Sequence, residues 1–338
     1  MSQMSPATVA RVLGHAFHFA PNDTGRAKLT EDIIECKLDP DDVHCSPELL
    51  AGLAHLYVYG MMRVFYNPKG PTPLVTPAQN ARSSFGDAVR TPSHLSTPTL
   101  MTTQTLRQRT MLRDENRCVF TGRLDFIVYQ SLPKAERPIG VSNVAYTHVA
   151  HIISQSLPSN IGGMTQAARE KFVWASTAAA VIERFGGFSA YTILGEDNLN
   201  SAANAFTASS TPHDMFDCLD LWLVPAQDKH GNIITDTYVV HSPFLLRAYG
   251  IKDQVIFRSY TFHDDDGNPI VIPAPHPSLI ALHAACAQVA HMSGAAEHLA
   301  ELYPDSDLDP GPSVMTQPNA SAKLVQKLKL VQLVPSVA

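Results

Sequence analysis

The stretches YTHVAHIIS (146–154) and NAFTASSTPHDMFD (204–217) decide the fold of this chain. The first stretch favours a strand, and the second begins with a short strand-like run over 204–209. Thr211 and Pro212 then favour a helix, because a threonine N-cap followed by a first-turn proline is typical of a helix start. The two stretches therefore predict two strands followed by a short helix.

Polar side chains stand at defined places in these otherwise apolar stretches. His151 ends the first strand-like run, Asn204 opens the second, and His213 lies in the first turn of the helix. Asp217 follows His213 by four residues, and side chains at that spacing share one face of a helix. An imidazole and a carboxylate placed in this way can converge on one cation. One-metal hydrolysis of a phosphodiester needs a base for water, an orienting group and a metal ligand.

Together with LRDENRCVFTGRLD (112–125), these stretches resemble the HNH endonuclease family, in the branch that is common in fungal genomes. The shared features are an RDxxRCxxTG opening, an AHI strand, the spacing from Asn204 to His213 and an HxxFD ending, in that order. The resemblance extends over roughly residues 106–245. It implies an α+β fold in which a ββα-metal (HNH) core carries helical N- and C-terminal extensions.

The resemblance also implies an activity, which is metal-dependent endonucleolytic hydrolysis of phosphodiester bonds in nucleic acid. His151 would be the general base that activates water, and Asn204 would hold the loop and orient that base. His213 would bind the metal, and Asp217, on the same helix face, would be a further ligand. The cofactor would be a divalent ion, either Mg²⁺, Mn²⁺ or a transition metal such as Zn²⁺ or Ni²⁺.

One position departs from the family pattern. Ala150 stands where many members have a metal-binding Asp or His immediately before the base. His148 has the same strand parity and would lie about 7 Å from position 150, so its use as a replacement ligand stays open. Ala150 also favours an alternative function, a catalytically inactive HNH-derived module that binds nucleic acid or a protein.

The charge of the chain limits how it can bind nucleic acid. Lys and Arg number 25 and Asp and Glu number 31, so the net charge is −6. A mildly acidic chain does not attract nucleic acid through its overall charge, so contact must be local. The densest basic run suggests phosphate contacts by Arg113, Arg117 and Arg123, while a solvated face with ion pairs is the alternative. DNA, in preference to RNA, is the expected partner.

Cysteine usage and hydropathy suggest the location. The five cysteines are scattered and form no CxxC pair, which argues against a zinc ribbon or a secreted disulfide framework. No signal peptide is recognised, and an intracellular location, cytoplasmic or nuclear, is expected. The long apolar run 49–66 contains His55 and Arg63, so we interpret it as a buried helix and expect no membrane partner.

Composition divides the chain into five parts. These are a helical N-terminal segment (1–66), a Pro/Ser/Thr-rich linker (67–105), the nuclease-like core (106–262), a C-terminal helical segment (263–302) and a flexible tail (303–338). The terminal helices are a possible binding surface for a protein partner. Within the core, local patterns predict a strand over 126–129, a helix over 165–185 and a hairpin around 229–232.

Overall fold

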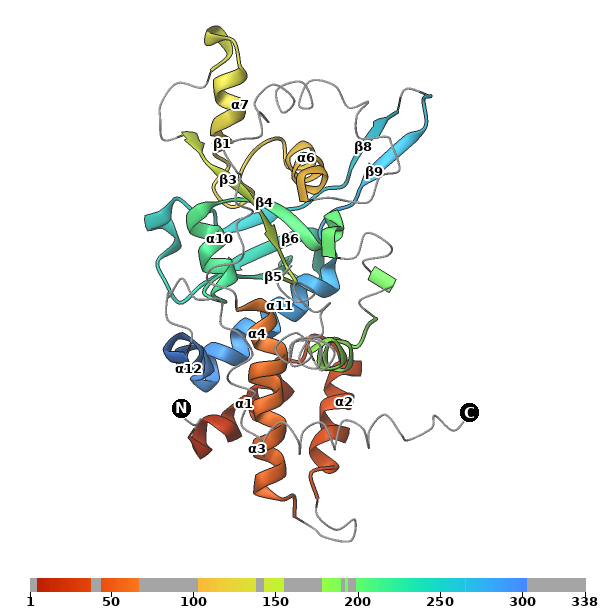
Figure 1. Ribbon diagram of the computed structural model, residues 1–338, viewed down its shortest axis with the longest axis vertical. Coiled ribbons are helices and arrows are strands. Elements are labelled where there is room, and N and C mark those ends of the chain that lie inside the picture. The colour runs from red at the N-terminus through yellow and green to blue at the C-terminus, as the bar shows by residue number, and fades with distance from the viewer. Residues whose placement is uncertain are drawn as a thin grey trace, which may run out of the picture. The chain divides into compact units, whose positions relative to one another are not determined.

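The computed structural model describes residues 5–37, 44–66, 103–137, 143–154, 178–189, 192–193, 199–264 and 266–302. These residues form a mixed helix and sheet structure, which confirms the α+β class (Figure 1). The tail 303–338 and nearly all of the expected linker lie outside the described residues. The chain divides into two units, one of Met1–Asn67, Ser156–Ala190 and Ala285–Ala338, the other of Pro68–Gln155 and Tyr191–Ala284.

The described residues of the first unit are largely helical. Its elements are α1 (Pro6–His18), α2 (Asp23–Ile34), α3 (Pro47–His55), the π-helical η1 (Leu56–Met62), α4 (Arg63–Phe65), the helical residues 178–186, the second half of α11 (Pro277–Ser293) and α12 (Ala295–Leu302). Ser46 caps α3 by accepting a hydrogen bond from the backbone N–H of Leu49. Every residue of η1 is buried, in agreement with our interpretation of this apolar run as a core helix.

Residues 156–190, which composition placed inside the core, group with the N-terminal helices. Two polar contacts hold their described part there. The Asn22 side chain donates to the carbonyl of Gly186 at 2.6 Å, and Arg184 pairs with Asp32 at 2.5 Å. The predicted helix over 165–185 is observed from residue 178, and its earlier part lies outside the described residues.

The second unit contains the two strands and the helix that the sequence predicts. β3 (Thr147–His151) pairs antiparallel with β4 (Ala205–Ser209), with His151 opposite Ala205 and Thr147 opposite Ser209. The helix α10 (Ser210–Asp217) follows β4 directly and packs on both strands (Figure 1). Its N-cap is Ser209, two residues before the Thr211 that we expected.

A further helix covers the same strand pair. α6 (Thr103–Arg113) contacts β3 and β4, and its Leu106 is fully buried with Ala205 in an apolar cluster. The other members are Ala202, directly before β4, and Phe262 and Ile272 of β8 (Tyr260–His263) and β9 (Pro269–Ile272), which pair antiparallel. The strand pair therefore packs against both α10 and α6, and α6 shares its apolar cluster with the hairpin of β8 and β9.

The strand expected over 126–129 is wrong, because α7 (Phe126–Ser131) occupies this segment. Asp125 is the N-cap of the helix, and its side chain accepts hydrogen bonds from the N–H groups of Ile127 and Val128 at 2.9 and 3.2 Å. The capping aspartate thus outweighs the strand propensity of the apolar run. The short strand β1 (Leu124–Asp125) precedes α7 and pairs parallel with β2 (Val144–Ala145).

The predicted hairpin is confirmed, and it belongs to a three-stranded sheet. The strands β5 (Trp222–Gln227), β6 (Ile233–His241) and β7 (Gln254–Ile256) are antiparallel in the order β5-β6-β7. Short 3₁₀ turns are η3 (Lys134–Glu136), η6 (Ala202–Asn204) and η7 (Leu246–Tyr249). Among the described helices none is long and apolar enough by itself to cross a membrane, although α11 and α12, bent by 88°, reach that length and apolarity as a pair.

Arg113 holds α6 to the rest of the second unit. Its side chain is 0% exposed and donates to the backbone carbonyls of Ala202, Ala205 and Pro273 at 2.8–2.9 Å. It also pairs with Asp114 at 2.8 Å. These contacts correct the expectation that Arg113 binds phosphate, because a buried guanidinium with these partners has no path to a nucleic acid.

We predict that Arg113→Met lowers the free energy of unfolding by about 3–5 kcal/mol, because it leaves buried carbonyls and the Asp114 carboxylate without their cation. Urea denaturation measures this change. The matched control is Arg247→Met, whose ion pair with Asp253 is 80% and 69% exposed, and this change costs about 0–1 kcal/mol. Equal losses in the two variants would contradict the structural role of Arg113.

Candidate functional site

Polar side chains of β3 and α10 meet on one face of the strand pair. The rings of His148 on β3 and His213 on α10 stack, with centroids 6.0 Å apart and planes at 27°. An edge contact between Phe206 on β4 and Phe216 on α10, with centroids 5.0 Å apart, fixes the helix against the strands. These ring contacts place the His213 imidazole over β3.

His148 occupies the face on which the expected ligand is missing. Side chains two residues apart in a strand lie on the same face, so His148 and Ala150 share the face toward α10. Ala150 is fully buried, and the imidazole that reaches His213 comes from His148. The Ser210 hydroxyl lies 3.3 Å from Nε2 of His148. The structure thus brings His148 next to His213, while its use as a replacement ligand stays a hypothesis.

His151 is the last residue of β3 and has an unused ring nitrogen. Its Nε2 atom is buried and has no hydrogen-bond partner among the described residues. Burial, followed by the proximity of His213, lowers the pKa of His151 to about 4, so the imidazole is neutral at pH 7. Strand alternation assigns His151 to the face opposite His148, but at the end of the strand it remains within the electrostatic reach of His213. An unpaired buried nitrogen is costly and suits a site that a ligand completes.

His213 and Asp217 are neighbours, as the spacing of four residues predicts. Nε2 of His213 lies 3.4 Å from Oδ2 of Asp217. Burial, and then His148, lowers the pKa of His213 to about 4, whereas burial, and then the charge of Asp214, raises the pKa of Asp217 well above its usual value. Both shifts favour the neutral form. A neutral imidazole is the form that binds a metal ion, while Asp217 must lose its proton to do so.

Asn204 fastens the end of β3 to the start of β4. Its side chain is completely buried, and its Oδ1 accepts from the N–H of Ile153 at 2.8 Å. Its Nδ2 donates to the carbonyls of Ile153 and Leu199, each at 3.0 Å. Both amide protons are therefore used by the protein itself. Asn204 is a positioning residue for the chain that follows His151, and it does not present its amide to a substrate.

A polar network that the sequence patterns did not predict lies at the other end of β3. The Asp125 carboxylate accepts from the hydroxyl and the N–H of Thr147, at 2.6 and 3.2 Å, and Arg107 donates to the carbonyl of Thr147 at 2.6 Å. After burial, the charge of Arg107 is the next cause that lowers the pKa of His148. Asp125 directly before an apolar helix could have been recognised as an N-cap, but its link to Thr147 has no local signal.

Arg117 and Arg123 lie in the turn that joins α6 to β1. The N–H of Val119 donates to the carbonyl of Thr207 at 3.0 Å, so this turn borders β4. Nη1 of Arg117 donates to the carbonyl of Gly122 at 3.0 Å. Both arginine side chains are half-buried.

The residues around His213 can be compared with the ligands that a metal ion needs. In the part of the chain that the structure describes, no group of three or more His, Cys, Asp or Glu side chains is arranged to hold a metal ion. A neutral imidazole and a carboxylate are nevertheless neighbours at His213 and Asp217, next to His148. These residue types fit a divalent ion whose remaining positions are filled by water or phosphate oxygens.

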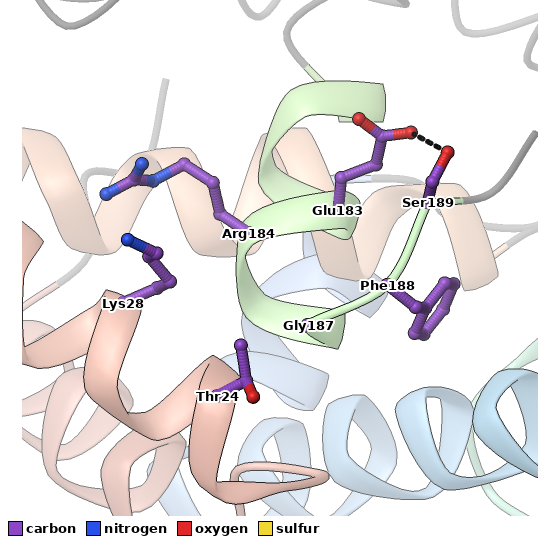
Figure 2. A pocket seen from close by; sticks show the side chains of 7 residues that line it. All are labelled: Thr24, Lys28, Glu183, Arg184, Gly187, Phe188 and Ser189. Atoms are coloured by element: carbon purple, nitrogen blue, oxygen red, sulfur yellow. Dashed lines mark hydrogen bonds between the residues drawn. The ribbon is translucent and has the colours of Figure 1, made fainter. Parts of the chain in front are cut away.

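The first unit has a hollow of about 380 Å³ between α2 and the end of the helix 178–186 with the residues that follow it (Figure 2). Its basic side chains already have acidic partners, since Lys28 pairs with Glu31 at 2.9 Å and Arg184 pairs with Asp32. Its lining residues are Thr24, Lys28, Glu183, Arg184, Gly187, Phe188 and Ser189. We assign no ligand to this hollow, because its cations are neutralised.

Comparison of the chain with protein-family models, with curated proteins and with solved structures gives no match. We therefore infer the function from the residues of this chain and from their geometry.

We predict that the free energy of unfolding falls as the pH is lowered from about 6.5 to about 4. The folded protein keeps His151 and His213 neutral in this range, whereas the unfolded chain binds protons with an ordinary pKa. At these two imidazoles the unfolded state binds more protons, whereas the raised pKa of Asp217 lets the folded state keep one proton more. The two imidazoles outnumber the single carboxyl group, so stability still increases with pH in this window, with a slope that Asp217 reduces. Each imidazole contributes about 2–3 kcal/mol.

Urea denaturation at several pH values tests this dependence. Glutamine does not titrate, so His213→Gln is expected to give a shallower slope of stability against pH. Lys229→Gln, in the exposed turn between β5 and β6, is the control and is expected to keep the wild-type slope. A wild-type slope in His213→Gln would show that this imidazole is not held neutral.

Proposed function

We propose that the second unit is a metal-dependent endonuclease of the HNH type, in which β3, β4 and α10 form the ββα-metal core. The observation that carries this proposal is the buried Nε2 atom of His151, which has no hydrogen-bond partner among the described residues. A neutral imidazole with an unused nitrogen can take a proton from water. It stands at the end of a strand whose partner helix carries His213 and Asp217.

The low pKa of His151 has a physical consequence for catalysis. A base with a pKa of about 4 accepts protons poorly at pH 7. The negative charge of a phosphodiester next to the ring favours the imidazolium form and raises the pKa. The substrate would therefore strengthen its own general base. The proton moves from the attacking water to His151 while the water oxygen bonds to phosphorus and the ester oxygen leaves.

The residues that would hold the cation are His213 and Asp217, with His148 as the third candidate. A bound divalent ion supplies Lewis-acid stabilisation of the phosphate and of the leaving oxygen. Two imidazoles favour Mn²⁺, Zn²⁺ or Ni²⁺ over Mg²⁺, which prefers oxygen ligands. Asn204 contributes by holding the chain that follows His151.

The second candidate function is a catalytically inactive module that binds nucleic acid. The observation that favours it is Ala150, which faces α10 and supplies no ligand. In such a module the stacked His148 and His213 rings would only pack the helix against the strand. The two functions differ in whether a metal ion produces cleavage.

A plasmid-nicking assay with Mg²⁺, Mn²⁺, Zn²⁺, Ni²⁺ or EDTA tests the proposal. We predict cleavage that requires a metal ion, and a loss of about 10²–10⁴-fold in rate for His151→Ala. His213→Ala is expected to abolish the metal-dependent activity, and Asp217→Asn to weaken it less. His148→Ala is expected to raise the metal concentration needed for half-maximal activity.

The matched control is His230→Ala, which removes an exposed histidine from the turn between β5 and β6. It is expected to cut like the wild type. Circular dichroism confirms that each variant is folded. Equal rates for the wild type and a folded His151→Ala would refute the role of the base, and DNA binding without cleavage under every metal would support the inactive module.

A further inference from the structure

Two glycine-containing turns of the second unit are joined by a hydrogen bond. Gly122 and Gly250 have φ values of +70° and +68°, in the left-handed region that favours glycine. The N–H of Lys252 donates to the carbonyl of Phe120 at 2.9 Å, which joins the segment after Gly250 to the turn before Gly122. The two turns are thus held at fixed positions relative to each other.

The two joined turns bring the side chains of Arg117, Arg123 and Lys252 together. A Cβ at Gly122 would lie 2.9 Å from Nζ of Lys252, and a Cβ at Gly250 would lie 3.4 Å from Nη2 of Arg123. Arg117 donates to the carbonyl of the same Gly122. Each cation therefore lies against a glycine of one of the two turns.

These three cations are not neutralised within the part of the chain that the structure describes. No ion pair there involves Arg117, Arg123 or Lys252, whereas the neighbouring Arg247 pairs with Asp253 at 3.2 Å. Three like charges repel one another. An anion that bridges them would remove this repulsion, so the cluster fits a ligand with several negative charges.

The position of the cluster relative to β3 indicates which anion it fits. In β4, Thr207 pairs with Val149 of β3, and its carbonyl accepts from Val119 of the basic turn. The turn thus follows β4 on the edge away from β3, about two strand spacings or ~10 Å from β3. Phosphates of one nucleic-acid strand follow one another at ~3.4 Å along the axis. A strand with its scissile phosphate at His151 would reach this turn within a few nucleotides if it runs across β4.

We propose that Arg117, Arg123 and Lys252 form a docking surface for the phosphate backbone of nucleic acid. The inference rests on the proposed function, because the nuclease site sets where the backbone runs. Contacts of lysine and arginine side chains to phosphates position a nucleic acid and carry no base readout. The surface therefore binds nucleic acid without sequence preference and aligns it with β3.

The test measures binding of a fluorescein-labelled DNA duplex by anisotropy, with the full chain, in EDTA and over a series of NaCl concentrations. Lys252→Gln and Arg123→Gln are each expected to weaken binding about 3–10-fold and to reduce the slope of log affinity against log salt by about 1. The double variant is expected to lose about twice that slope. Arg117 is left intact, because it also bonds the turn.

Lys229→Gln is the matched control, because it removes the same charge from an exposed turn at the far end of β6. It is expected to bind like the wild type. The inference is overturned if the folded double variant keeps the wild-type affinity and salt slope, or if the wild type does not bind. EDTA separates binding from chemistry, so loss of binding in the double variant supports the surface even if the wild type never cleaves DNA.

Discussion

The second unit depends on the bonds between the buried Asn204 side chain and the backbone of Ile153. β3 ends at His151, β4 begins at Ala205, and much of the chain between them belongs to the other unit. Closing the long loop between the two strands costs conformational entropy. The short β3–β4 pairing and the Asn204 bonds must offset this cost together. The Asn204 amide bonds both the N–H and the carbonyl of Ile153, so it fixes the point at which the long loop returns to the strand pair.

The register set by Asn204 decides which side chains form the site. A slip of one residue between β3 and β4 would move every side chain of one strand to the other face. If β3 changed face, His148 would leave His213, and if β4 changed face, the Phe206 ring would leave Phe216. The stacking of the two imidazoles therefore depends on a register that the Asn204 hydrogen bonds help to set, although these bonds involve neither ring. This is why an amide without contact to a substrate is as important for the site as the histidines.

Local patterns predicted β3, β4, α10 and the hairpin, because each has its own periodicity and turn residues. They did not predict α7, since the capping bonds of Asp125 decide that segment against its strand propensity. The grouping of residues 156–190 with the N-terminal helices depends on non-local contacts such as that of Asn22 with Gly186, which no local pattern contains. The contact of His148 with His213 depends on strand register, and strand parity alone could only suggest it.

Non-local contacts also decide which cations of the basic run can reach a phosphate, and the sequence of the run does not contain them. Arg113 and Arg123 are equivalent by composition, but Arg113 is enclosed by carbonyls and Asp114, whereas Arg123 lies at a turn beside Lys252. Whether a guanidinium can bind an anion depends on the acceptors that the fold has already given it. With a net charge of −6, the chain does not attract a polyanion through its overall charge. A few unneutralised cations can then orient a nucleic acid strand, because they attract it locally.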